Sequence, residues 1–155
     1  MQLSTTAFIF IGYQNDYFAA DGILRAVVEE ADRTRNILAN SLDLLSALEE
    51  HETTLIQTPI IFTADYSELI NPVGILKVIQ DVGAFKQGSP GAEIIDEFKS
   101  LGERINIVKG KRGLNAFSNT ELDQLLAERG ITHVVLAGAV TSICIDSTGL
   151  SLIHI

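Results

Sequence analysis

The only cysteine of the chain, Cys144, is the residue best placed to act as a nucleophile. It follows an apolar, β-branched run at 134–139, which has the length and composition of a buried strand. A short turn separates that run from the cysteine, and the residues after it can begin a helix. Exposed N–H groups and the helix dipole favour the reactive thiolate at such a position. A lone cysteine is more often a small buried hydrophobic residue, but this strand–turn–cysteine–helix order favours a nucleophile.

Charged side chains that could assist a thiolate follow other apolar runs. Lys109, Lys111 and Arg112 stand together in a basic loop, and each could supply a cation beside the sulfur. Asp16 and Asp65 also follow apolar runs and could exchange protons with a substrate. Simpler explanations exist for both groups, because a basic loop is commonly just solvated and an aspartate in a turn often accepts bonds from backbone N–H groups.

Strand and helix patterns alternate along the chain. Near-continuous apolar runs predict parallel strands, and they lie at 7–12, 55–63, 105–108 and 133–139. Helical spacing of apolar residues predicts one long helix over 27–50, and further helices over 74–80, after Pro90, over 120–129 and from Cys144 onward. The alternation predicts an α/β fold with three layers, α/β/α, around a Rossmann-like parallel sheet.

Right-handed crossovers place the carboxyl ends of all parallel strands at one edge of the sheet. Four loops should therefore converge there, at 12–18, 64–67, 109–117 and 139–144. Because open α/β sheets bind ligands at that edge, we expect the pocket between these loops.

The segment around the cysteine resembles the isochorismatase-like cysteine hydrolases. Their signature is a strand followed by Gly, two small residues, Thr, two residues, Cys and then Ser-Thr, and the matching residues are Gly138, Thr141, Cys144, Ser147 and Thr148. Further matches follow in family order at 88–94, 108–117, 120–122 and 130–131. The resemblance implies an isochorismatase-like fold and a hydrolase that forms a covalent thioester on the cysteine.

The resemblance also assigns roles to particular residues. The catalytic lysine of this family stands six residues before a phenylalanine, which is the spacing of Lys111 and Phe117. The backbone N–H groups of Thr141 and Cys144 would form the oxyanion hole, with a cis peptide bond before Thr141. A retained cysteine resembles the amide-cleaving branch (nicotinamidase, N-carbamoyl amide and ureido hydrolases) rather than isochorismatase proper, which cleaves a vinyl ether without this thiol.

One position departs from the family pattern. The expected motif is Asp-x-Gln-x-Asp-Phe, and this chain has Gly12-Tyr13-Gln14-Asn15-Asp16-Tyr17, so glycine occupies the place of the catalytic aspartate. Loss of a positioned acid or base typically costs about 10²–10⁴-fold in rate. Three interpretations stay open: Asp16 or Asp65 substitutes, the chemistry has changed, or the domain is a degenerate one that binds a small molecule or assists assembly.

We expect the substrate pocket to include Tyr13, Gln14, Phe18 and Phe117. Nicotinamidase-like proteins carry Asp-x-His and a further histidine for a divalent ion, whereas this chain has Asp65-Tyr66-Ser67. We therefore predict no metal, and no other cofactor.

Composition limits the class of protein. With 155 residues, of which 46% are hydrophobic, the chain can form one domain, 1–155, with its own core. A net charge of −9 argues against nucleic acid or an anionic membrane as partner. The resemblance implies a small-molecule substrate. A single cysteine suits a reducing, cytoplasmic location. The resemblance is compatible with a homo-oligomer.

The last residues carry a separate hypothesis. Family members continue for some tens of residues past the cysteine helix, so we expect this domain to lack its last strand or strands and a helix. Residues 150–155, LSLIHI, match a translation of a transposon end used in preparing sequencing libraries. The hypothesis is that these six residues are not native.

Overall fold

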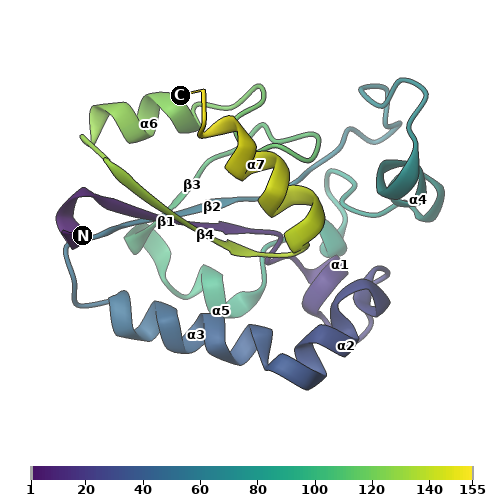
Figure 1. Ribbon diagram of the computed structural model, residues 1–155. Coiled ribbons are helices and arrows are strands. Elements are labelled where there is room, and N and C mark those ends of the chain that lie inside the picture. The colour runs from purple at the N-terminus through teal and green to yellow at the C-terminus, as the bar shows by residue number, and fades with distance from the viewer. Residues whose placement is uncertain (1, 155) are drawn as a thin grey trace.

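A four-stranded parallel sheet forms the centre of the protein in a computed structural model that describes residues 2–154 (Figure 1). Its strand order is β3-β2-β1-β4, and the bounds are β1 Thr6–Ile11, β2 Thr54–Thr58, β3 Ile105–Ile107 and β4 His133–Gly138. Helices α2, α3 and α5 lie on one side of the sheet, and α6 and α7 lie on the other (Figure 1). The predicted three-layer α/β/α fold with a parallel sheet is therefore confirmed.

The helices are more numerous than the sequence predicts, and several are shorter than the predicted segments that contain them. Their bounds are α1 Asn15–Phe18, α2 Arg25–Arg35, α3 Ile37–Leu48, α4 Gly74–Val82, α5 Asp96–Lys99, α6 Leu122–Glu128 and α7 Asp146–Ser151. Short 3₁₀ segments are η1 Leu3–Thr5, η2 Pro90–Ala92 and η3 Gly102–Arg104, and a π-helical turn, η4, spans Thr141–Ile145. None of the helices in the described part of the chain is long and apolar enough to cross a membrane.

Strand β1 is central, and its side chains supply both cores of the molecule. Successive side chains of a strand point to opposite faces, so Phe8 and Phe10 pack with α2, α3 and α5, whereas Ile9 and Ile11 pack with α6 and the Cys144 segment. Every residue of β1 is buried, because β2 and β4 cover its two edges and helices cover its two faces. This is why the first apolar run of the sequence is uninterrupted.

Two predicted elements were too long. The expected helix over 27–50 is broken at Asn36, which has left-handed backbone angles (φ 49°, ψ 45°), a conformation that asparagine tolerates better than most residues. The carboxylate of Asp32 accepts the backbone N–H of Leu38 at 3.0 Å and holds the bend. The strand expected over 55–63 ends at Thr58, because Pro59 has no N–H to donate to a neighbouring strand.

Candidate active site

Cys144 lies in the helical segment that leaves the carboxyl end of β4. The π-helical turn η4 contains it, and α7 continues directly from that turn. Cys144 is 7% exposed and packs in the core on the α6 side of the sheet. One side chain of α7, Thr148, accepts the backbone N–H of Ala116 at 3.1 Å and so ties the cysteine segment to the 109–117 loop.

Lys111 is the cation that the fold brings to the sulfur. Its Nζ donates to Cys144 Sγ at 3.7 Å and to the carbonyl oxygen of Gly113 at 2.6 Å, and the residue is 1% exposed. Desolvation lowers the pKa of Lys111, and the neighbouring Cys144 opposes that shift. Of its two sequence rivals, Arg112 pairs with Glu68 at the surface, and Lys109 lines a different groove.

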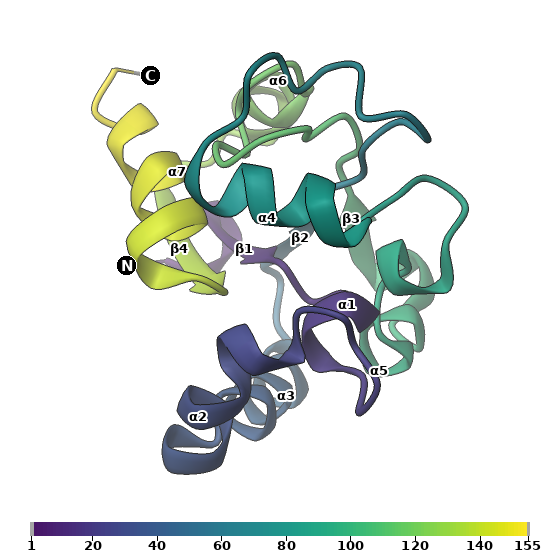
Figure 2. The same cartoon turned by 90° about the vertical axis from the view of Figure 1, so that its right-hand side faces the viewer.

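A small cavity surrounds this pair. Its volume is about 10 Å³, room for roughly one water molecule. Apolar side chains supply most of its wall, and the lining residues are Ile11, Gly12, Tyr17, Ile60, Ile75, Ile79, Lys111, Leu114, Ala139, Ile143 and Cys144. The walls come from loops after β1, β2, β3 and β4 together with α4, which crosses in front of the strand ends (Figure 2).

Gly12 lines the cavity where the family pattern has its catalytic aspartate. Its φ is +84°, a conformation that strains any L side chain. A Cβ atom added there would lie 2.7 Å from the carbonyl oxygen of Ala139 and 3.5 Å from the ring of Tyr17. The backbone at this position is therefore built for glycine, and the space beside it is occupied by the tyrosine.

The two aspartates considered as substitutes lie outside the cavity lining. Asp16 is buried, and its Oδ2 accepts the backbone N–H of Phe85 at 2.6 Å while its carboxyl group lies against Gly91. Burial raises the pKa of Asp16, and the bond from Phe85 opposes that rise. Asp65 accepts bonds from the hydroxyl of Thr63 and the N–H of Ser67, and these lower its pKa. Both carboxylates hold local loop structure.

The residues expected to form the substrate pocket pack elsewhere. Gln14 is fully buried and bonds to the backbone of Ile60 and Ala92. Tyr13 donates to or accepts from Ser41 at 2.6 Å and stacks on Phe18. Those aromatic rings belong to the core on the α3 side of the sheet, and Phe117 packs into the core on the other side. Consecutive residues of a segment point in different directions. In the segment after β1, Tyr17 lines the cavity, whereas the expected residues Tyr13, Gln14 and Phe18 do not.

Thr141 is exposed and lines a separate groove between the 138–141 turn and α2. The cis peptide bond of this turn joins Ala139 and Val140, one residue earlier than expected. Thus the expected position of the cis bond was wrong, whereas the turn itself lies at the predicted edge of the sheet.

Several cavity residues were not anticipated from the sequence. Ile75 and Ile79 lie one turn apart on α4 and form the side of the cavity that this helix covers. Leu114 and Ile143 complete its apolar wall. Tyr17 could have been found from the motif, because it is a tyrosine in the position where the family pattern has phenylalanine. The α4 residues have the spacing of an ordinary amphipathic helix, and nothing in that spacing indicates that Ile75 and Ile79 line a cavity.

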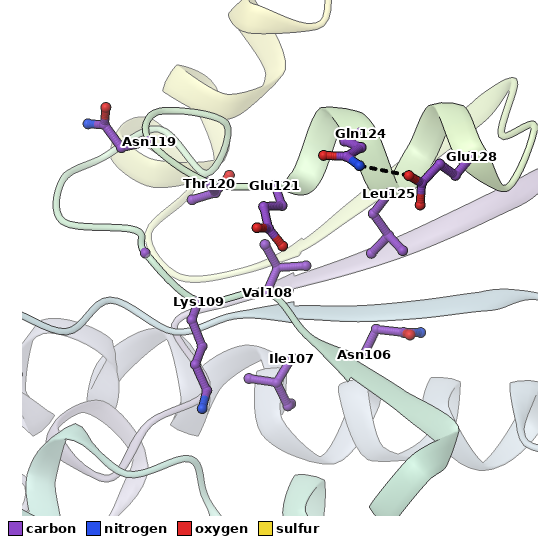
Figure 3. A pocket seen from close by; sticks show the side chains of 11 residues that line it. Asn106, Ile107, Val108, Lys109, Asn119, Thr120, Glu121, Gln124, Leu125 and Glu128 are labelled. Atoms are coloured by element: carbon purple, nitrogen blue, oxygen red, sulfur yellow. Dashed lines mark hydrogen bonds between the residues drawn. The ribbon is translucent and has the colours of Figure 1, made fainter.

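A wider groove, of about 590 Å³, lies between β3 and α6 and is shown in Figure 3. Polar side chains line much of it, including Asn106, Asn119, Thr120, Glu121, Gln124 and Glu128. Gln124 donates to Glu128 at 2.7 Å across one helical turn. This groove contains neither Cys144 nor Lys111. Within residues 2–154, no three His, Cys, Asp or Glu side chains gather as metal ligands.

Comparison with known families and structures gives one consistent result. The family model of the isochorismatase domain matches residues 6–154. A cysteine hydrolase from Pseudomonas syringae pv. phaseolicola 1448A superposes with a TM-score of 0.82 at 24% identity, over 99% of this chain and 68% of that one. The N-carbamoylsarcosine amidase of Thermoplasma acidophilum superposes with a TM-score of 0.74 at 18% identity, over 99% of this chain and 77% of the amidase. The nicotinamidase of Bacillus subtilis superposes with a TM-score of 0.69 at 24% identity, over 99% of this chain and 80% of the nicotinamidase. At these identities the structural likeness concerns the fold.

Proposed function

This chain belongs to the isochorismatase family of hydrolases, and we propose from that premise that it cleaves a C–N bond, of amide or ureide type, in a small molecule. Cys144 would be the nucleophile, and Lys111 the cation that holds its thiolate. The single observation that carries the proposal is the 3.7 Å separation of Lys111 Nζ and Cys144 Sγ in a small cavity at the strand ends.

The energetic argument concerns the charge on Lys111. A cation withdrawn from water is costly unless an anion compensates it. Desolvation accordingly lowers the pKa of Lys111, and the sulfur beside it favours the charged form. No Asp or Glu among the described residues lines the cavity. The Cys144 sulfur, which accepts a hydrogen bond from Lys111, would therefore carry the negative charge that compensates the ammonium group. An ammonium–thiolate pair is the nucleophilic form of a cysteine.

The proposed reaction proceeds in two halves. Cys144 Sγ attacks the carbonyl carbon, and the C–N bond breaks to leave a thioester and an amine. Water then attacks the thioester, the C–S bond breaks, and the acid product leaves. The backbone N–H groups of Thr141 and Cys144 are our proposal for the oxyanion hole, since they belong to the first turn of the helical segment after β4.

Substrate entry requires the cavity to widen, because a volume of about 10 Å³ does not hold an amide beside the sulfur. Ile75 and Ile79 cover it from α4, a nine-residue helix joined to the sheet through irregular segments. The substrate would therefore displace α4 from the strand ends. Apolar wall residues favour a substrate whose non-reacting part is small and uncharged.

A second candidate function is supported by Gly12. Without a carboxylate at that place, the domain could bind a small molecule, or assist assembly, without chemistry. The two functions differ in turnover. A hydrolase releases product from the amides or ureides that it binds, whereas a binding domain returns them intact.

The test is an amide and ureide panel that includes nicotinamide and N-carbamoylsarcosine, with ammonia or amine release as the readout. The expected result is turnover of at least one compound by the wild-type protein and none by Cys144→Ala. Binding without turnover, measured by calorimetry on the same compounds, would instead support the non-catalytic function. Turnover that persists in Cys144→Ala would contradict the proposed mechanism.

A further inference from the structure

The cavity around Cys144 contains one ionisable group that the proposed mechanism leaves unused, the phenol of Tyr17. Three of the eleven lining residues are titratable, namely Cys144, Lys111 and Tyr17. The first two form the nucleophile and its cation. Cleavage of a C–N bond also needs a proton for the departing nitrogen, because an amide anion is a very poor leaving group.

Tyr17 occupies the space that Gly12 leaves open. Two ring atoms, Cδ2 and Cε2, lie 3.5 Å from the place where a Cβ of residue 12 would stand. The ring is buried and meets Phe85 edge-on, with the ring centroids 5.0 Å apart. Phe85 is in turn fixed by the bond from its N–H to Asp16. The tyrosine is thus held firmly against the position from which the carboxylate is missing.

The hydroxyl of Tyr17 differs from those of the other two tyrosines. Tyr13 shares a hydrogen bond with Ser41, and Tyr66 donates to the carbonyl oxygen of Ala84. Tyr17 has no side-chain hydrogen-bond partner within residues 2–154. The Tyr17 hydroxyl is not among the buried polar atoms that lack a partner within residues 2–154, so the polar end of this otherwise buried side chain stays open to a partner that arrives with the substrate.

The charges around Tyr17 fix its protonation state. Burial raises the pKa of Tyr17, and the negative charges of Cys144 and Asp16 raise it further. The hydroxyl is therefore protonated at neutral pH and can donate a proton but does not compete with Cys144 as an anion. Lys111, in the same cavity, can balance the charge that forms when the proton leaves.

We propose that the hydroxyl of Tyr17 is the proton donor to the leaving nitrogen, in the role of the carboxyl group absent at Gly12. As Cys144 Sγ forms its bond to the carbonyl carbon and the C–N bond breaks, nitrogen takes the Tyr17 proton. The products of this half are a thioester, a neutral amine and a tyrosinate paired with Lys111. The tyrosinate then takes a proton from water, the resulting hydroxide adds to the thioester, and the C–S bond breaks to restore the thiolate. The sum is hydrolysis of one C–N bond by one water.

This inference rests on the proposed function, and leaving-group chemistry separates the two. p-Nitrophenyl acetate acylates a cysteine without a proton donor, because p-nitrophenolate is a stable anion. Tyr17→Phe should leave the p-nitrophenolate burst within a few-fold of wild type. It should lower amide turnover, on the panel compound that wild type cleaves fastest, by about 10²–10⁴-fold. Tyr66→Phe is the matched control, since it removes a hydroxyl outside the cavity, and both rates should stay near those of wild type.

The outcomes are distinct. If Tyr17→Phe cleaves the amide as fast as wild type, or loses the ester burst equally, the inference is overturned and the proposed function stands. If wild type shows no Cys144-dependent amide turnover, the proposed function and this inference both fall. Should Tyr17→Phe fail to fold, as judged by circular dichroism, 3-fluorotyrosine incorporated into wild type provides the test. A more acidic phenol is a stronger proton donor, so amide kcat at neutral pH should rise while the p-nitrophenolate burst stays unchanged, and an unchanged amide kcat would overturn the inference.

Discussion

The hydroxyl of Thr148 accepts a hydrogen bond from the backbone N–H of Ala116 at 3.1 Å, inside the core. Thr148 belongs to the helix that follows Cys144, and Ala116 to the loop that carries Lys111. A second bond, from Asn115 to Ser151 at 2.6 Å, joins the same two segments. These two hydrogen bonds fix the position of the Lys111 loop relative to the Cys144 segment, although none of the four bonded residues belongs to the reacting pair.

Replacing Thr148 by valine keeps the shape of the side chain and removes the acceptor. The N–H of Ala116 would then be buried without a partner, which costs about 1–3 kcal/mol. We expect Thr148→Val to lower the free energy of unfolding by that amount in urea titrations, and Thr148→Ser to lower it less. No loss in Thr148→Val, together with a loss in Thr148→Ser, would show that the methyl group, not the hydroxyl, matters.

Gly12→Asp supplies the carboxyl group of the family pattern but should not raise amide turnover. The side chain must adopt φ near +84°, and its Cβ would meet the carbonyl oxygen of Ala139 at 2.7 Å. Substitutions that force such shifts cost about 1–3 kcal/mol, and a non-glycine residue at positive φ adds strain. Thermal unfolding should show a similar loss for Gly12→Ala, because the conflict begins at Cβ. A stable Gly12→Asp variant with raised amide turnover would contradict this account of the cavity.

Gly91 should be intolerant of any side chain. A Cβ there would overlap the buried carboxyl group of Asp16, which in turn holds the N–H of Phe85. We expect Gly91→Ala to destabilise the protein by about 1–3 kcal/mol. Gly113→Ala is the control, because that Cβ meets nothing within 4 Å and the glycine has no positive φ. Chemical denaturation of the two variants decides the question, and equal midpoints would argue against the tight contact.

The lowered pKa of Lys111 gives a pH dependence with a definite sign. Between that pKa and the ordinary value of 10.5, the unfolded chain binds more protons at this site than the folded chain. Stability contributed by Lys111 therefore increases as pH rises through that window and is lowest below it. Relative to Lys111→Met, wild type should gain unfolding free energy as pH rises toward 10.5. A constant difference, or one of opposite slope, would mean that desolvation does not dominate at this residue.

Much of the fold could be predicted from local pattern. The run 7–12 is apolar without a break, which requires a strand covered on both faces, and the structure has β1 in the centre of the sheet. The break at Asn36 could not be predicted in the same way. Helical spacing continues through it, and the bend depends on a bond from Leu38 to Asp32 that forms only after the chain has turned.

Part of the candidate site could be predicted, namely the residues for which the family pattern specifies both a residue type and a position along the chain. The family resemblance distinguishes Lys111 from Lys109 and Arg112 by its distance along the chain from Phe117, and Lys111 is the cation that bonds to Cys144. The cavity lining was not predictable, because it depends on which way each loop residue points. Tyr13 and Tyr17 both pack in the core on the α3 side of the sheet, but only Tyr17 also lines the cavity that contains Cys144.

The central claim is that Lys111 activates Cys144, and the rate of Cys144 alkylation tests it most directly. Iodoacetamide should label Cys144 of the wild-type protein at neutral pH faster than it labels a free thiol such as N-acetylcysteine. Lys111→Met, which keeps the chain length and removes the charge, should slow labelling by at least about tenfold, one decade corresponding to about 1.4 kcal/mol of lost thiolate stabilisation. Equal rates for wild type, Lys111→Met and the free thiol, with unfolding monitored to confirm that the variant is folded, would contradict the claim.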